Sequence, residues 1–139
     1  MYLWGHFPIN RKHLRNAKDT YNFALNYIHV SQCSIGLFPE GTRSPIGRPI
    51  ELKKGGFHLA MQSQLTILPT LIIGSGELWP YNDYLTSPGI TYVRVLDPIY
   101  IQSNDTYMSL LKKTRRAMLQ GYAQPIQYQK LQHSNLFID

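Results

Sequence analysis

The chain has 139 residues, of which 43% are hydrophobic and 16% charged, so it can bury one core and is too apolar for a disordered protein. Its single cysteine excludes an internal disulfide, and with it a disulfide-stapled secreted scaffold and a zinc site built on paired cysteines. Fourteen Lys and Arg against eight Asp and Glu give a net charge of +6. That charge favours phosphate-bearing partners: nucleic acid, an anionic membrane or a small phosphorylated ligand.

No apolar run approaches the ~18 residues that a membrane-spanning helix needs. The longest, residues 65–73, is interrupted by Thr66, Pro69 and Thr70. The first five residues lack the basic and apolar regions of a signal peptide. We therefore expect an intracellular protein without a transmembrane helix.

Short apolar runs and helical spacing of apolar residues divide the chain into alternating predicted elements. In chain order these are a buried strand at 2–9, a helix from 16 to about 30, a strand at 33–38, an irregular connection at 39–56, a helix from 57 to about 64, buried strands at 65–73 and 90–96, and a helix at roughly 105–119. Apolar stripes at steps of three and four mark the first and last helices: Ala17, Tyr21, Ala24, Leu25 and Ile28, then Tyr107, Leu110, Leu111, Ala117 and Met118. For the last helix, Ser103, Asn104 and Asp105 offer N-cap residues.

Alternating strands and helices predict a single α/β domain with a mixed, largely parallel sheet flanked by helices. We place this domain at residues 1–120. Residues 121–139 form a glutamine-rich tail without hydrophobic period, which we expect to be loosely ordered.

Residues 38–44 hold the most informative group of side chains. Glu40, Thr42 and Arg43 offer a carboxylate, a hydroxyl and a guanidinium after a predicted strand, and Gly41 lets a ligand approach the backbone closely. The planar fork of Arg43 matches phosphate geometry, and ligands of α/β sheets bind where strands end. The spacing alone fits equally well an ordinary solvated loop in which Glu40 pairs with Arg43.

The amino-acid sequence of this stretch, Phe-Pro-Glu-Gly-Thr-Arg-Ser, resembles the signature block of the glycerophospholipid acyltransferases, typified by 1-acyl-sn-glycerol-3-phosphate acyltransferases. Three further blocks, at 5–11, 53–60 and 67–72, are similar to others of that family and follow its order. The resemblance covers roughly residues 1–100. It implies a glycerol-3-phosphate acyltransferase-like fold and transfer of a fatty acyl group from acyl-CoA or acyl carrier protein to a lysophospholipid hydroxyl in phospholipid biosynthesis. It implies no cofactor beyond this co-substrate.

The family match also assigns roles to single residues. By resemblance, Arg11 and Arg43 hold the phosphate of the acceptor, and Glu40, Gly41 and Thr42 shape that site. Two arginines on one phosphate are also physically reasonable, because each charge-assisted contact is worth ~1.5–3 kcal/mol.

The acyl-donor side is assigned in the same way. By resemblance, Lys54 and Gly55 belong to the lysine-glycine start of the following helix, and Pro69 lies on the strand that floors the donor site. Thr70 stands where the family often has an aliphatic residue.

The catalytic pair of the family, a histidine followed five positions later by an aspartate, is missing. The histidine would take the proton of the attacking hydroxyl, and the aspartate would orient the imidazole. The positions five residues after the five histidines hold Arg11, Lys18, Ser34, Ser63 and Ile138. We therefore find no catalytic residue in this chain and expect that it does not turn over substrate alone. Met1 is expected to be an internal methionine of a longer protein or the start of a truncated gene product.

Basic clusters at 112–116 and 11–18 have two interpretations, a solvated helical face or a contact with anionic lipid headgroups. The second would place the protein at the cytoplasmic face of a membrane, without spanning it.

The histidines lack a paired spacing for a metal, so we predict no metal site. The main alternative function is a non-catalytic, truncated phospholipid-binding protein. Nucleic acid is not an expected partner, because no known recognition pattern is present.

Overall fold

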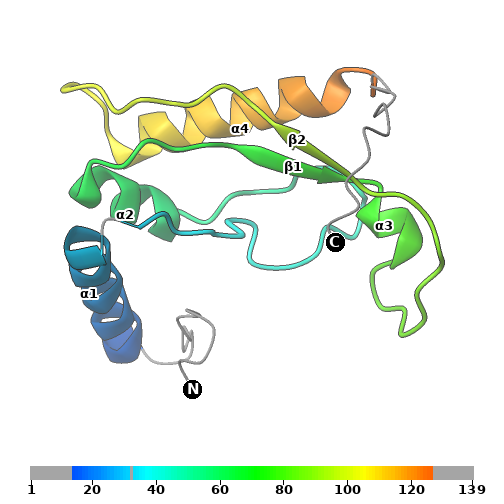
Figure 1. Cartoon of the computed structure of the whole chain (residues 1–139), viewed down its shortest axis with the longest axis horizontal. Helices are drawn as coiled ribbons and strands as arrows, with labels where there is room; N and C mark the ends of the chain where they lie inside the picture. Colours follow the sequence, from blue (N-terminus) through cyan, green and yellow to red (C-terminus); the bar gives the residue numbers. More distant parts are fainter. Residues whose placement is uncertain (1–13, 32, 127–139) are drawn as a thin grey trace, which may run out of the picture.

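The structure is a computed structural model that describes residues 14–31 and 33–126, with side chains from residue 21 onward. Its elements, in chain order, are α1 (Leu14–Ser31), α2 (Gly55–Ser63), β1 (Thr70–Ile73), α3 (Ser75–Leu78), β2 (Tyr92–Val95) and α4 (Tyr107–Ala123) (Figure 1). The three predicted helices are thus confirmed as α1, α2 and α4, and both predicted strands after residue 64 are found in shorter form. The strand predicted at 2–9 lies outside the described residues.

The sheet of the described residues is an antiparallel pair, β1 with β2, in which Thr70 lies opposite Val95 and Ile73 opposite Tyr92. Beyond it, Ile67 and Ile99 exchange backbone hydrogen bonds of 3.0 and 2.8 Å. The largely parallel sheet that we predicted is therefore wrong. A parallel return needs a long crossover, usually a helix, whereas only the four-residue α3 and a loop separate β1 from β2.

The strand predicted at 33–38 is not found either. Among the described residues this segment joins no ladder, and Leu37 and Phe38 are exposed. An apolar run of six residues can satisfy the sequence criterion for a strand without finding a partner in the sheet.

The N-terminus of α4 is fixed one residue later than predicted, at Thr106. The Thr106 hydroxyl accepts a hydrogen bond from the Ser109 amide at 3.1 Å, and the Thr106 amide donates to Ser109 Oγ at 3.0 Å, which makes a capping box. Asp105 instead accepts hydrogen bonds from Ser109 Oγ and Lys113 Nζ, both at 2.7 Å. The polar run 103–105 therefore precedes the cap, and only Asp105 takes part in holding the first turns.

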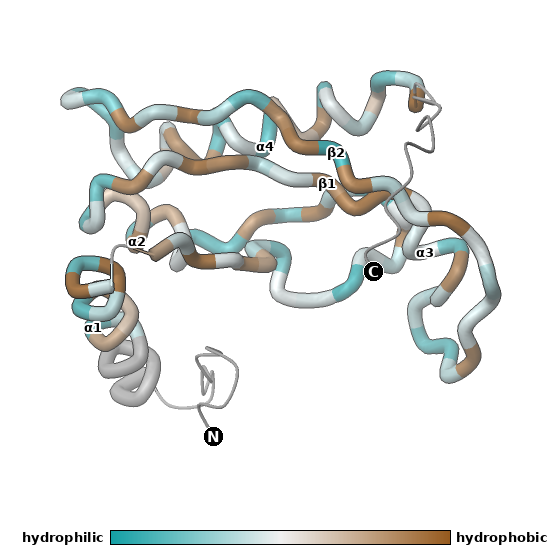
Figure 2. The backbone as a smooth tube through the Cα atoms, viewed as in Figure 1, coloured by the Kyte–Doolittle hydropathy of each residue, from teal (hydrophilic) through white to brown (hydrophobic). Residues whose placement is uncertain are grey.

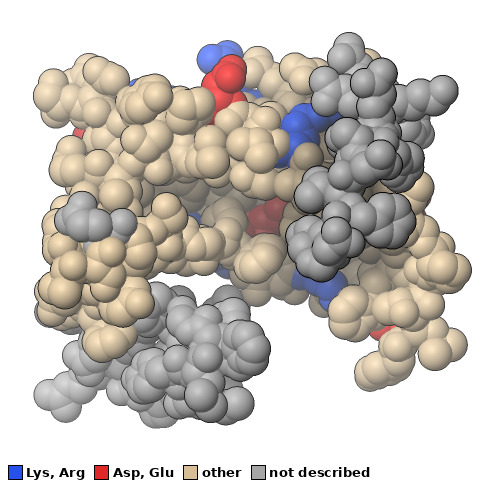
Figure 3. Space-filling view, in the orientation of Figure 1, with Lys and Arg blue, Asp and Glu red and all other residues tan. Residues whose placement is uncertain are grey.

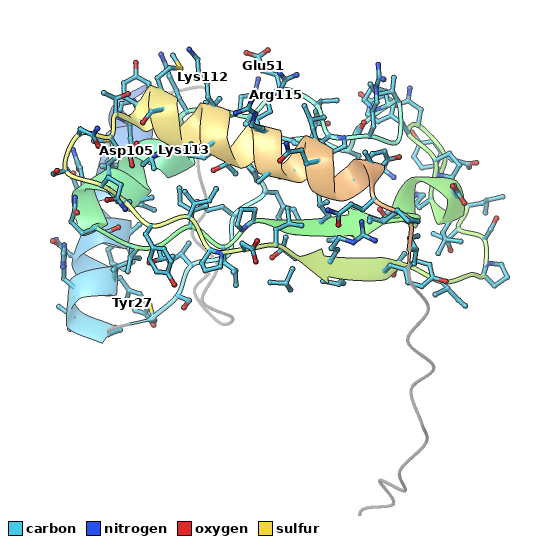
Figure 4. All side chains as sticks on the ribbon, turned by 90° about the horizontal axis from the view of Figure 1, so that it is seen from above. Tyr27, Glu51, Asp105, Lys112, Lys113 and Arg115 are labelled. Atoms are coloured by element: carbon cyan, nitrogen blue, oxygen red, sulfur yellow. The ribbon has the colours of Figure 1, made fainter. Side chains whose placement is uncertain are left out.

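The main core lies between α4, β1 and the start of α2, with Leu52, Phe57, Leu71, Leu110 and Met118 buried together. A smaller cluster joins α1 to α2 through Ala24, Ile28 and Leu59. Figures 1 and 4 show α4 along one side of the strand pair, and Figure 2 shows apolar residues along both strands. The strand residues that point away from α4, Ile72, Val93 and Val95, are more than half exposed. None of the helices described is both long and apolar enough to span a bilayer.

Candidate functional site

The loop that carries Glu40, Gly41, Thr42 and Arg43, the predicted phosphate-binding residues, begins with a tight turn. The Gly41 amide donates to the Phe38 carbonyl oxygen at 3.0 Å. Gly41 itself has φ +71°, in the left-handed region that glycine adopts without steric cost. The backbone of the turn therefore favours glycine at this position.

This turn lies beside the start of α2, so two of the sequence blocks meet in space. The Lys53 amide donates to the Pro39 carbonyl oxygen at 2.7 Å, and Lys54 is the N-cap residue of α2. A methyl group added to Gly56 would come within 2.9 Å of Leu37 Cδ1, so the segment before the turn packs closely on the helix. The structure thereby brings the predicted residues 40–43 close to Lys54 and Gly55.

Arg43 lies over an aromatic ring that sequence analysis did not connect with it. The guanidinium carbon is 4.4 Å from the centroid of the Trp79 ring, a cation–π contact. Glu40 does not pair with Arg43, so the alternative of a Glu40–Arg43 ion pair is wrong. Within the described ranges, the ion pair found is Lys113 with Asp105, at 2.7 Å. Because Trp79 follows the short α3 in an irregular segment, neither spacing nor periodicity could have assigned it to the site.

The far end of the same loop is fastened to α4. The Tyr122 hydroxyl donates to the Gly47 carbonyl oxygen at 2.9 Å, and Ser44 Oγ donates to the Arg48 carbonyl oxygen at 2.6 Å. The loop is thus held at its beginning by Lys53, in its middle by Trp79 and at its end by Tyr122. Thr42 and Arg43 remain exposed, and Glu40 is half-buried.

Pro69, a predicted site residue, is not part of this site. Pro69 is buried just before β1, and its carbonyl oxygen accepts from the Leu96 amide at 2.9 Å, so it serves the sheet. Arg11 lies outside the described residues. Among the residues that the structure describes, no three His, Cys, Asp or Glu side chains gather as a metal site would require.

Exposed cations of α4 form the second feature of interest. Lys113 is engaged by Asp105, whereas Lys112, Arg115 and Arg116 are exposed and, in the described part of the chain, without an ion-pair partner. Figure 4 shows Lys112 and Arg115 on the side of α4 that faces away from the strands. The opposite side of the molecule, seen in Figure 3, carries few charged side chains. Lys112 and Arg115 therefore lie away from the exposed sheet face.

Comparison with known proteins places these features in a family. The Acyltransferase family model matches residues 1–73. The chain is 36% identical over 94 residues to a 1-acyl-sn-glycerol-3-phosphate acyltransferase of Limnanthes alba, which covers 68% of this chain and 34% of that protein. It is 30% identical over 152 residues to the yeast (Saccharomyces cerevisiae) protein of the same name, covering 96% of this chain and 50% of the relative.

A solved structure supports the fold. The crystal structure of the 1-acyl-sn-glycerophosphate (LPA) acyltransferase PlsC from Thermotoga maritima matches with a TM-score of 0.68 and 23% identity, covering 80% of this chain and 47% of that one. The chain spans a third to a half of the length of the relatives named here. Because the family model covers more than half of its residues, the chain belongs to the acyltransferase family.

Proposed function

We propose that this chain carries the acceptor-phosphate site of an enzyme that transfers a fatty acyl group from acyl-CoA or acyl carrier protein to the hydroxyl of lysophosphatidic acid. One observation carries the proposal: the loop of Glu40, Thr42 and Arg43 is fixed against the start of α2 and leaves the Arg43 side chain exposed. The relatives, named as 1-acyl-sn-glycerol-3-phosphate acyltransferases, supply the substrate class.

Arg43 would bind the phosphate, since its fork of donors can contact two oxygens at once. The left-handed Gly41 lets the phosphate approach the backbone, and Thr42 adds a hydroxyl donor. Arg11 would supply the second cation, as the family pattern implies. The exposed Lys54 ammonium, at the neighbouring helix start, adds to the positive potential.

The donor side would involve Lys54, Gly55 and the Pro69 segment. Pro69 is buried, but Leu68 and Ile72 on either side of it are more than half exposed and apolar. Such a surface suits an acyl chain, because covering apolar area is favourable by about 25 cal/mol per Å². Transfer of an acyl group from a thioester to a hydroxyl releases a thiol and changes no oxidation state. We therefore propose no metal or redox cofactor.

We also propose that this chain alone does not catalyse the transfer. A hydroxyl attacks a thioester efficiently only when a general base takes its proton, and no histidine of the sequence has an aspartate five positions on. The same observation favours the second candidate, a phospholipid-binding protein without catalysis. The two candidates share the phosphate site and differ in turnover.

Peripheral contact with an anionic membrane is the last part of the proposal. Met108, Lys112, Arg115, Leu119 and Tyr122 follow one another at helical spacing and are all at least partly exposed on α4. Cations interleaved with apolar side chains on one helical face are typical of helices that lie on lipid surfaces.

The acceptor site is tested by binding. The unchanged chain should bind lysophosphatidic acid more tightly than monoacylglycerol with the same acyl chain, which lacks the phosphate. Arg43→Ala should weaken lysophosphatidic acid binding about 10- to 100-fold, because one charge-assisted contact is worth ~1.5–3 kcal/mol. Titration calorimetry below the micelle concentration measures both ligands.

Arg48→Ala is the matched control, since Arg48 is an exposed cation of the same loop. It should leave the affinity within about twofold. If Arg43→Ala binds lysophosphatidic acid as well as the unchanged chain does, the acceptor site is not at this loop.

A further inference from the structure

Arg43 holds its guanidinium over the face of the Trp79 ring. The 4.4 Å from Cζ to the ring centroid falls well inside the ~6 Å range of cation–π attraction. A guanidinium donates its hydrogen bonds from its edges, in its own plane. With five N–H donors around the guanidinium, an arginine held over one ring keeps donors available to a ligand while its position is restricted.

Trp79 is itself fixed by its surroundings, although its side chain is 47% exposed. Its indole Nε1 donates to the Asp83 carbonyl oxygen at 2.8 Å, and its amide donates to the Ser75 carbonyl oxygen at 3.0 Å. The Asp83 side chain in turn accepts from the Leu85 amide at 3.0 Å, which closes the turn. The ring is thus anchored from α3 on one side and from the 80–85 turn on the other.

An arginine on an exposed loop normally samples many rotamers, and a phosphate must then immobilise it on binding. The fixed indole removes part of that cost before the ligand arrives. We propose that Trp79 is a positioning residue for the acceptor phosphate, acting through Arg43. This inference rests on the proposed function, in which Arg43 binds that phosphate.

Three single variants of the full chain, Trp79→Leu, Trp79→Phe and Arg43→Ala, and one double variant test the inference with sn-glycerol 3-phosphate as the probe. Trp79→Leu keeps an apolar side chain but loses the π face, and should weaken binding about two- to fivefold, the effect expected for an exposed cation–π pair. Trp79→Phe keeps a ring and should recover most of the affinity. Trp79→Leu in an Arg43→Ala background should cause no additional loss, because the arginine through which Trp79 acts is gone.

A ligand-free measurement examines the stack separately. In the unchanged chain, the Arg43 side-chain protons should show upfield ring-current shifts in NMR spectra. Trp79→Phe should keep these shifts, and Trp79→Leu should abolish them. Circular dichroism of each variant checks that the helices are retained.

The outcomes separate the two proposals. If the unchanged chain binds the probe and Arg43→Ala abolishes binding, but Trp79→Leu binds as tightly as the unchanged chain, the positioning role is overturned and the phosphate site stands. If Arg43→Ala has no effect, or the unchanged chain does not bind, the proposed function falls and the positioning role with it. Absence of ring-current shifts in the unchanged chain overturns the positioning role alone.

Discussion

Asp105 shows how a single carboxylate fastens the first turns of α4. Its side chain, only 4% exposed, accepts hydrogen bonds from Lys113 Nζ and Ser109 Oγ, and from the Gln102 amide at 3.0 Å. The hydrogen bond from Lys113, followed by those from Ser109 and Gln102, lowers the pKa of Asp105 from 3.8 to about 2. The ionised form is therefore favoured more strongly in the folded chain than in the unfolded one.

A pH dependence of stability follows. Because the folded pKa lies below the unfolded one, this contribution is complete above about pH 4 and is lost as the pH falls towards 2. Asp105→Asn should lower the free energy of unfolding at neutral pH and flatten its dependence between these values, as measured by urea denaturation at a series of pH values. Asp97→Asn, which removes an exposed carboxylate, is the control and should keep the acid dependence. An unchanged acid slope in Asp105→Asn would contradict the assignment.

At the same scale, the sequence indicated most of the candidate site but not all of it. Glu40, Gly41, Thr42 and Arg43 could be found because they form one contiguous block that the family shares. Trp79 could not, since an exposed ring in an irregular segment follows no periodicity. Its relation to Arg43 exists only once the chain has folded.

Among the elements, α4 is held at its C-terminal end by a residue of β2. The last carbonyl groups of a helix lack partners within the helix. Arg94 donates to the Gly121 carbonyl oxygen, to that of Gln124 at 3.0 Å and to that of Pro125 at 2.8 Å. One guanidinium thus satisfies the helix end and joins it to the sheet, and its positive charge also suits the negative end of the helix dipole.

Removing this clamp should destabilise the fold. We expect Arg94→Ala to lower the free energy of unfolding by about 2–3 kcal/mol, because three charge-assisted hydrogen bonds to carbonyl oxygens are lost, of which the one to Gly121 is part-buried. Arg94→Lys should recover only part of it, since an ammonium cannot span three carbonyls as a fork does. Arg116→Ala removes an exposed cation of α4 and should change stability by no more than about 0.5 kcal/mol. Equal urea midpoints for Arg94→Ala and Arg116→Ala would show that the clamp contributes nothing.

Helices and strands could be predicted where the pattern that marks them lies within one short stretch of sequence. Apolar residues at steps of three and four identified α1 and α4, since that spacing places them on one buried face. Strand direction has no local signal: the runs at 65–73 and 90–96 are compatible with either orientation, and the connection between them decides. The run at 33–38 has strand composition but pairs with no strand in the part of the chain that the structure describes, which no single-sequence pattern reveals.

At the scale of the whole molecule, the net charge of +6 favours an anionic partner, and the two basic clusters are the candidate contact surfaces. If α4 lies on anionic lipid, Lys112→Glu combined with Arg115→Glu should weaken binding to phosphatidylglycerol-containing vesicles at least tenfold, because each basic residue near the surface adds about 1 kcal/mol. Binding to pure phosphatidylcholine vesicles should be weak for both proteins. Vesicle co-sedimentation at low salt measures the difference.

A charge reversal in α1, Lys18→Glu, distinguishes this surface from the other basic cluster. It should leave most of the vesicle binding intact. A larger loss in Lys18→Glu than in the α4 variant would assign the contact to α1 instead, and no loss in either would exclude an electrostatic contact through these two helices.

The hydrogen bond from Tyr122 to Gly47 joins residues 75 positions apart in the chain. Proteins are synthesised from the N-terminus, and early segments can fold before later ones exist. On a growing polypeptide, the motif loop and α2 are complete long before the residue that fastens the far end of the loop has been made. The far end of the loop that we propose binds phosphate is therefore among the last parts of a newly synthesised chain to be fixed. A message that stopped short of α4 would encode every residue of the motif and still leave the far end of its loop unfastened.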